Sequence, residues 1–154
     1  MPGIIVGIDG SERARHALEW AVKEAAIRQT PLTVLTVQQA VEGTWGAPAP
    51  VSGRWGGPVG YAADSTLAQH VQETAQQETD AILEKAESRP PSVSVQAVTG
   101  LPAEELLKAA GDADLIVVGS RGAGGFRRLL MGSVCAQVTH HAACPVVVVP
   151  AQAG

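Results

Sequence analysis

The sequence predicts an α/β fold in which helices cover both faces of a five-stranded parallel sheet. Short apolar runs rich in Val, Ile and Leu alternate along the chain with segments of helical periodicity. Hydrophobic residues make up 45% of the chain and aromatic residues only 3%, so aliphatic side chains must fill the core, as in a buried parallel sheet. With 154 residues, the chain has about the size of one ordinary domain, and we expect residues 1–154 to form a single domain.

The first predicted elements are a buried strand and an amphipathic helix. Residues 4–8 form an apolar run that ends at the Asp-Gly-Ser turn of residues 9–11, where Ser11 is the expected helix cap. The apolar positions that follow recur at helical spacing: Leu18, Ala21, Val22 and Ala25. This pattern predicts a helix of about 16 residues that ends before Pro31.

The middle of the chain predicts a second strand, a long loop and a long helix. Residues 32–37 are rich in β-branched side chains and favour a strand. Residues 39–64 combine Gly, Pro and Ala with two Trp and show no periodicity, which is typical of a loop. We expect the helix to run from Leu67 to about Ser88, because the prolines at 90–91 cannot continue it.

The last part of the chain predicts three more strands and two helices. Alternating side chains favour a strand at 93–97, and residues 102–111 predict a short helix that starts at a proline and closes at a glycine. An apolar run at 115–118 predicts the fourth strand, followed by a helix at about 133–142. The fifth strand is expected at 146–149, between two prolines.

Charge, hydropathy and cysteine content exclude several classes of protein. The net charge of −4 and the pI near 5.5 provide no electrostatic attraction to nucleic acid or to an anionic membrane. No apolar run approaches the roughly 20 residues of a membrane-spanning helix. Two cysteines, Cys135 and Cys144, are too few for a disulfide scaffold. We therefore expect a cytoplasmic protein with reduced thiols.

Glycine residues punctuate the connection between the fourth strand and the last helix. Gly119 and Gly122 follow the strand, nine residues come next, and Gly132-Ser133 opens the helix. Glycine lets the main chain approach a ligand closely, and free N–H groups at a helix start bind phosphate. Open parallel sheets bind ligands at the carboxyl ends of their strands. This connection therefore predicts a phosphate-binding loop.

Two common nucleotide-binding motifs fit this sequence less well. The sequence contains no Gly-Lys pair, which a Walker A motif requires, and Arg127 stands where the third glycine of GxGxxG would be. A single glycine more often makes a flexible loop, and Ser133 alone would be an ordinary helix cap. The combination of glycines at the end of a central strand favours binding.

At these residues the chain resembles the universal stress protein family, in the branch whose ATP-binding motif is G-x2-G-x9-G-[ST]. The glycines named above and Ser133 fill this motif without a gap. The likeness extends to the opening Ile-Ile-Val-Gly-Ile-Asp-Gly-Ser, to the strand Leu-Ile-Val-Val-Gly-Ser-Arg-Gly and to the ending His-Ala-Ala-Cys-Pro-Val-Val-Val-Val. It implies a Rossmann-like three-layer sandwich, similar to the adenine nucleotide alpha hydrolases, with strand order 3-2-1-4-5 and a role in the stress response.

The resemblance also implies which residues contact ATP and its Mg²⁺. The implied binding residues are Ile8, Asp9, Val37, Val118, Gly119, Arg121, Gly122, Gly132, Ser133, Val134 and Cys135. Ile8 and Val37 would line the adenine slot, and Asp9 would lie near the ribose and the Mg-nucleotide. Residues 118–122 would pass beside the ribose and phosphates, and residues 132–134 would hold the phosphates.

Three of these residues leave alternatives open. Cys135 stands where many ATP-binding members have Ser or Thr, which puts one side-chain hydrogen bond to phosphate in doubt but keeps the main-chain donor. Asp9 follows a strand in a common turn, so its carboxylate also fits a role in capping main-chain N–H groups. Arg121 suits a phosphate, although loop arginines are usually solvated.

The sequence predicts a binding protein without a catalytic or metal site. Phosphoryl transfer needs a basic group on the transferred phosphate and carboxylates on Mg²⁺, and Asp9 is the one carboxylate expected near the phosphates. All three lysines lie in helical segments: Lys23, Lys85 and Lys108. The cluster of His140, His141 and Cys144 lacks an apparent fourth ligand for a metal. We expect slow ATP hydrolysis or autophosphorylation at most.

The family's strand order would place residues 146–149 at a sheet edge. Bare apolar edges invite pairing, so we predict a homodimer through Val146–Val149; an edge covered by the C-terminal tail or by residues 39–64 is the alternative. The second functional hypothesis is a nucleotide-free dimeric adaptor of the same fold that binds an unidentified protein partner. A redox or flavin carrier is disfavoured, because no aromatic pair flanks the site.

Overall fold

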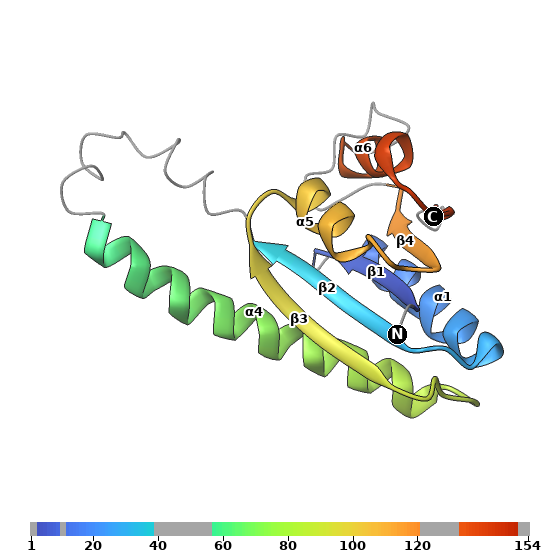
Figure 1. Ribbon diagram of the computed structural model, residues 1–154. Helices are drawn as coiled ribbons and strands as arrows, with labels where there is room; N and C mark the ends of the chain where they lie inside the picture. The colour runs from blue at the N-terminus through green and yellow to red at the C-terminus, as the bar shows by residue number, and fades with distance from the viewer. Residues whose placement is uncertain (1–2, 10–11, 39–56, 121–132, 151–154) are drawn as a thin grey trace.

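The computed structural model describes residues 3–9, 12–38, 57–120 and 133–150. Strands and helices alternate along these ranges (Figure 1). The elements are β1 (Ile4–Ile8), α1 (Glu12–Arg28), β2 (Leu32–Gln38), α4 (Gly57–Lys85), β3 (Val93–Thr99), α5 (Pro102–Ala109), β4 (Leu115–Gly119), α6 (Ser133–His141) and β5 (Val146–Val149). Residues 10–11, including the expected cap Ser11, lie outside the described residues.

The five strands form one parallel sheet in the order β3-β2-β1-β4-β5. This confirms the predicted fold class and strand order. Because all strands run the same way, their carboxyl ends lie along one edge of the sheet, as the arrowheads in Figure 1 show. The neighbours β1 and β4 are connected to helices on opposite faces, so the order of the chain reverses between them.

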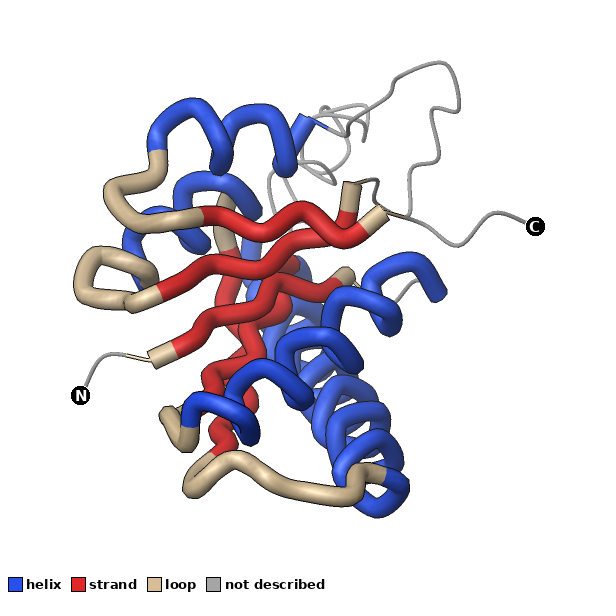
Figure 2. Tube along the Cα trace, turned by 90° about the vertical axis from the view of Figure 1, so that its right-hand side faces the viewer, coloured by secondary structure: helices blue, strands red, loops and turns tan. Residues whose placement is uncertain are grey.

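The core consists of two aliphatic layers, one on each face of the sheet. Figure 2 shows the helices that cover these two faces. Side chains alternate along a strand: Ile4, Val6 and Ile8 pack toward α1 and α4, whereas Ile5 packs toward α5 and α6. Helix α1 lies over β1 and β4, and α4 lies over β2 and β3. Aliphatic side chains fill both layers, as the composition predicted.

The helices begin and end at residues with clear local reasons. Helix α1 ends at Arg28 because Gln29 adopts the left-handed conformation, with φ of 51°, and the N–H of Thr30 then donates to the carbonyl of Ala25 at 3.0 Å. Helix α5 starts at Pro102 without a side-chain cap, because proline has no N–H to satisfy at this position.

The long loop predicted for residues 39–64 is wrong in its last part. Helix α4 begins at Gly57, so residues 57–64 are helical, and it ends at Lys85 rather than at Ser88. Glycine and Pro58 suggested a loop, but proline is tolerated in the first turn of a helix, and the alanines that follow favour one. Residues 39–56 lie outside the described part of the chain.

Candidate functional site

The carboxyl ends of β1, β2 and β4 meet at one edge of the sheet. Strands β1 and β4 pair in register from Ile4↔Leu115 to Val6↔Val117. Asp9 follows β1 with an exposed side chain, and Ser120 follows β4. The position between β1 and β4, where the chain order reverses, is where open α/β sheets bind ligands.

The N-terminus of helix α6 lies at this same edge. The connection from the carboxyl end of β4 leads to Ser133, and α6 then runs back toward the start of the parallel strand β5. The first turn of α6 carries no acidic residue, whereas the first turn of α5 carries Glu104 and Glu105. The positive end of the α6 dipole is therefore not neutralised by a carboxylate of its own first turn.

The described site residues approach this edge in different ways. Ile8 is buried in the layer that contains α1 and α4, whereas Val37 packs against the opposite layer. Their strands pair with Ile8 opposite Thr36. The structure thus places the two residues near one another along the edge but directs their side chains to opposite faces of the sheet.

The predicted residues of β4 lie at the centre of the edge. Val118 is 3% exposed and packs under α5 and α6, so its main chain is the part that faces the edge. Gly119 is the last residue of β4 and pairs with Val149. Arg121, Gly122 and Gly132 lie outside the described residues, so their predicted contacts are expectations from the motif.

Cys135 lies in the core beneath the start of α6. Its side chain is 2% exposed and packs in the same layer as Val118 and Val138. Burial raises the pKa of the thiol above its ordinary value, because a thiolate loses its hydration there. Only the main-chain N–H of Cys135 can therefore serve a ligand in this conformation. Val134, one residue earlier, is half-buried against the same layer.

Gln38 is a residue of this edge that the sequence did not single out. Its Oε1 atom is buried and has no hydrogen-bond partner among the described residues, while its main-chain carbonyl accepts the N–H of Gly100 at 2.9 Å. An unpaired buried acceptor costs ~1–3 kcal/mol. The alternation of β2 places Gln38 on the same face of the sheet as Ile8. Its place directly after Val37 is the signal that could have identified it.

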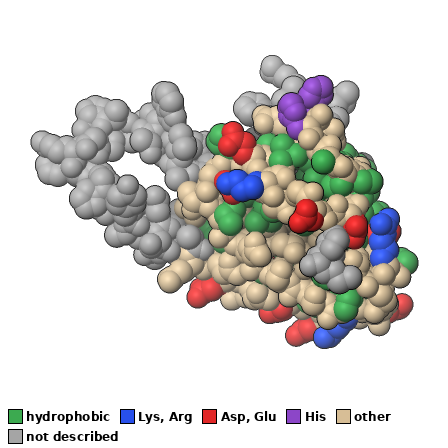
Figure 3. Space-filling view, in the orientation of Figure 1, with side chains coloured by type: hydrophobic (Ala, Val, Ile, Leu, Met, Phe, Trp, Pro, Cys, Tyr) green, Lys and Arg blue, Asp and Glu red, His purple; other side chains and the backbone are tan. Residues whose placement is uncertain are grey.

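The sequence also raised the questions of a metal site at the histidines and of a membrane-spanning helix. Among the described residues, no group of three or more His, Cys, Asp or Glu is arranged to hold a metal ion. The rings of His140 and His141 meet edge to face with centroids 4.8 Å apart, and Figure 3 shows histidine side chains on the surface over α6. None of the helices in the described ranges is long and apolar enough to span a membrane.

Strand β5 lies at the edge of the sheet beside β4. All four of its valines are partly exposed. It is held to the sheet by pairing with β4 and by the N–H of Ser120, which donates to the carbonyl of Val149 at 3.0 Å. The predicted edge position of residues 146–149 is therefore confirmed.

Comparison with known proteins assigns the chain to a family. Residues 2–150 match the sequence profile of the Universal stress protein family (Usp). The chain is 32% identical over 147 residues to Universal stress protein Rv2005c of Mycobacterium tuberculosis, with 96% of this chain and 47% of that protein covered. It therefore spans about half the length of that relative.

Solved structures show the same fold. The universal stress protein UspA from Lactobacillus plantarum is 26% identical with a TM-score of 0.78, covering 96% of this chain and 97% of that one. A universal stress protein in complex with cAMP is 22% identical with a TM-score of 0.64, and 98% of each chain is covered. The family profile and the identity to curated relatives together show that the chain belongs to the universal stress protein family.

Proposed function

We propose that this universal stress protein binds ATP with Mg²⁺ at the carboxyl edge of its sheet and uses the nucleotide as a signal or structural ligand in the stress response. The observation that carries the proposal is the start of α6, which lies at the edge where the chain order reverses and has no carboxylate in its first turn. Free N–H groups at such a helix start bind phosphate.

The residue roles in this proposal combine the structure with the motif. The main chain of residues 132–135 binds phosphate, because Cys135 keeps its thiol in the core and has only its N–H to offer. Gly119 and Gly122 bring main chain close to the ribose and phosphates. Asp9, exposed at the end of β1, lies near the ribose and the metal ion. Arg121 adds positive charge beside the phosphates.

The opposite directions of Ile8 and Val37 refine the proposed adenine slot. A base placed at the ends of β1 and β2 meets main chain of both strands, with Val37 on one side and the Ile8 and Gln38 side chains on the other. The related protein solved with cAMP supports an adenine nucleotide as the ligand class.

The proposed activity is binding rather than turnover. All three lysines lie in helices: Lys23 and Lys85 belong to α1 and α4, and Lys108 belongs to α5 and lies 3.5 Å from Glu105. None of them follows a strand at the carboxyl edge, so no lysine is placed to stabilise charge on a transferred phosphoryl group. ATP hydrolysis or autophosphorylation is at most slow in this proposal.

The proposed assembly is a homodimer through Val146–Val149. The apolar, partly exposed edge of β5 supports it, because an unpaired strand edge of this kind adds a neighbouring strand readily. A nucleotide-free adaptor of the same fold is the second candidate function. Such an adaptor would form the same dimer and bind its protein partner through the surface of that dimer. A single domain of residues 1–154 in the cytoplasm remains the expectation for this chain.

Analysis of the protein purified without added nucleotide separates the two candidates. Denatured protein is chromatographed for released nucleotide, and a second portion is incubated overnight with labelled ATP and Mg²⁺. Adenine nucleotide in the first portion, or bound and largely intact ATP in the second, supports the proposal. Absence of nucleotide from both portions supports the adaptor.

A further inference from the structure

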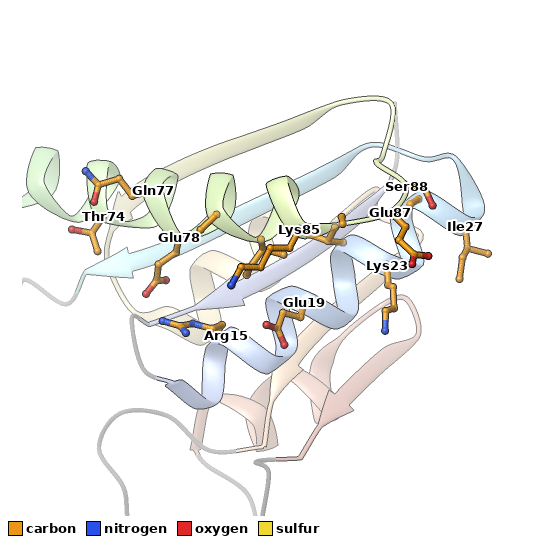
Figure 4. A pocket seen from close by; sticks show the side chains of 15 residues that line it. Arg15, Glu19, Lys23, Ile27, Thr74, Gln77, Glu78, Lys85, Glu87 and Ser88 are labelled. Atoms are coloured by element: carbon orange, nitrogen blue, oxygen red, sulfur yellow. The ribbon is translucent and has the colours of Figure 1, made fainter.

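A groove of about 830 Å³ lies between α1 and α4 and extends from Arg15, in the first turn of α1, to Ser88, just beyond α4 (Figure 4). Small and aliphatic side chains of α1, of α4 and of the residue after α4 line its floor: Val22, Ala26, Ala81, Ile82 and Ala86. None of the residues that line the groove belongs to the nucleotide site proposed above.

Charged side chains of alternating sign line both walls of the groove. Along α1 the order is Arg15, Glu19, Lys23; along α4 and the residues after it the order is Glu78, Lys85, Glu87. The three positive and three negative charges leave the groove formally neutral. Within the described ranges, none of these six side chains forms an ion pair within 4.0 Å.

Another pair of charged residues shows that side chains on α1 can form ion pairs with one another. Glu24 and Arg28, four residues apart, form an ion pair with Oε2 and Nε 2.7 Å apart. Glu19 and Lys23 have the same spacing and the favourable order for a helix pair, yet they form no ion pair. Their charged groups are therefore available to a binding partner.

The outward row of α1 ends in an exposed apolar side chain. Arg15, Glu19, Lys23 and Ile27 follow one another at intervals of four residues and all are exposed, Ile27 by 74%. Such a row forms a ridge along a helix that fits the groove of a second helix.

The ridge is complementary to itself when two copies run antiparallel. Glu19 and Lys23 lie two residues on either side of Ala21, and Arg15 and Ile27 lie six residues on either side. A two-fold axis that passes outside α1, at the level of Ala21 along the helix, places Glu19 of one copy opposite Lys23 of the other, twice. The same axis places Ile27 against the aliphatic stem of Arg15, which can cover it.

We propose that the α1/α4 groove binds a second copy of this chain, with its α1 ridge seated antiparallel in the groove. A two-fold interface requires such self-complementarity. A formally neutral groove disfavours an anion or nucleic acid as the occupant. This contact uses side chains of α1 and α4, whereas the dimer proposed above uses the edge of β5, so the two contacts involve different residues.

Charge reversal provides a direct test, read by sedimentation velocity of the full chain at low salt. In the proposed contact, position 19 of one copy faces position 23 of the other. Glu19→Lys therefore places lysine opposite lysine at both pairs, and Lys23→Glu places glutamate opposite glutamate at both pairs. Each variant should self-associate through this face at least about tenfold more weakly than the unchanged protein. An equimolar mixture of the two variants should recover the association, because each lysine then faces a glutamate.

Glu24→Lys and Arg28→Glu are the matched controls, because they make the same charge changes on α1 at residues that do not line the groove. They should associate like the unchanged protein, and circular dichroism checks that all four variants fold. Pairing through β5 is independent of these changes and would remain as a separate step. Three results would overturn the proposal. The first is that the unchanged protein does not self-associate, or that the two groove variants associate as strongly as it does. The others are an equal loss of association in the two controls and a mixture of the groove variants that does not regain association.

Discussion

Gly7 faces Leu106 so closely that a Cβ atom on Gly7 would lie 2.8 Å from the Leu106 Cδ1 atom. Gly7 is the one residue without a side chain in β1, and Leu106 is a buried residue of α5. Glycine in this strand thus lets α5 approach the sheet next to the residues that lead to Asp9.

Gly7→Ala should therefore destabilise the fold by ~1–3 kcal/mol, because Leu106 and α5 must shift to admit a methyl group. Urea unfolding followed by circular dichroism measures the change. Gly111→Ala is the control, since a Cβ there would meet only the Lys108 carbonyl at 3.7 Å. Equal stability of the two variants would contradict the close packing of α5 on β1.

Gln38→Met should leave the free energy of unfolding of the nucleotide-free protein unchanged or raise it. The substitution removes a buried acceptor that has no partner among the described residues, and such an atom contributes only a desolvation cost. Gln72→Met is the matched control, because the Gln72 Nε2 donates to the Val95 carbonyl at 2.7 Å. The control should lose ~1 kcal/mol of unfolding free energy. If Gln38→Met loses more unfolding free energy than this control, the Oε1 atom of Gln38 is hydrogen-bonded.

Thiol burial predicts a decrease in stability at high pH. Burial raises the pKa of both Cys135 and Cys144 above the ordinary value of 9.0, and for Cys144 the nearby Asp114 adds to the increase. Above pH 9.0 the unfolded chain loses thiol protons that the folded chain keeps, so unfolding becomes more favourable. Chemical unfolding between pH 8 and pH 10 should show this decrease, and it should be smaller in Cys135→Ala. A decrease of the same size in both proteins would exclude Cys135 as a cause.

Val148→Pro should abolish the dimer that we propose through β5, because proline lacks the N–H and disturbs the strand edge. Val148→Ala keeps the main chain intact and is the control for the loss of side-chain volume. Sedimentation at matched concentrations compares the two variants. A dimer that persists in Val148→Pro with the helical content unchanged would indicate that another surface holds the copies together.

The fold was predictable because its signals are local. The apolar run at residues 4–8 and the four valines before Pro150 predict strands, and Pro102 marks a helix start. The start of α4 was missed because Gly57 and Pro58 have the composition of a turn, although proline is also tolerated in the first turn of a helix.

The sequence predicted which elements carry the candidate site residues, but not the directions of their side chains. Gly119 and Ser133 follow from motif spacing, and their elements do meet at the carboxyl edge. The directions of Ile8 and Val37 depend on the register between β1 and β2, which pairs Ile8 with Thr36. A shift of one residue would turn each side chain to the other face, and no local pattern determines the register.

The central claim is that the start of α6 and the glycine segment before it bind a triphosphate. Calorimetric titration of the unchanged protein and of Gly122→Val with Mg-ATP tests this claim most directly, with circular dichroism as the check that the variant folds. We predict saturable heat for the unchanged protein and none for the folded variant. Equal heats for both proteins, or no heat for the unchanged protein after removal of any bound nucleotide, would contradict the claim.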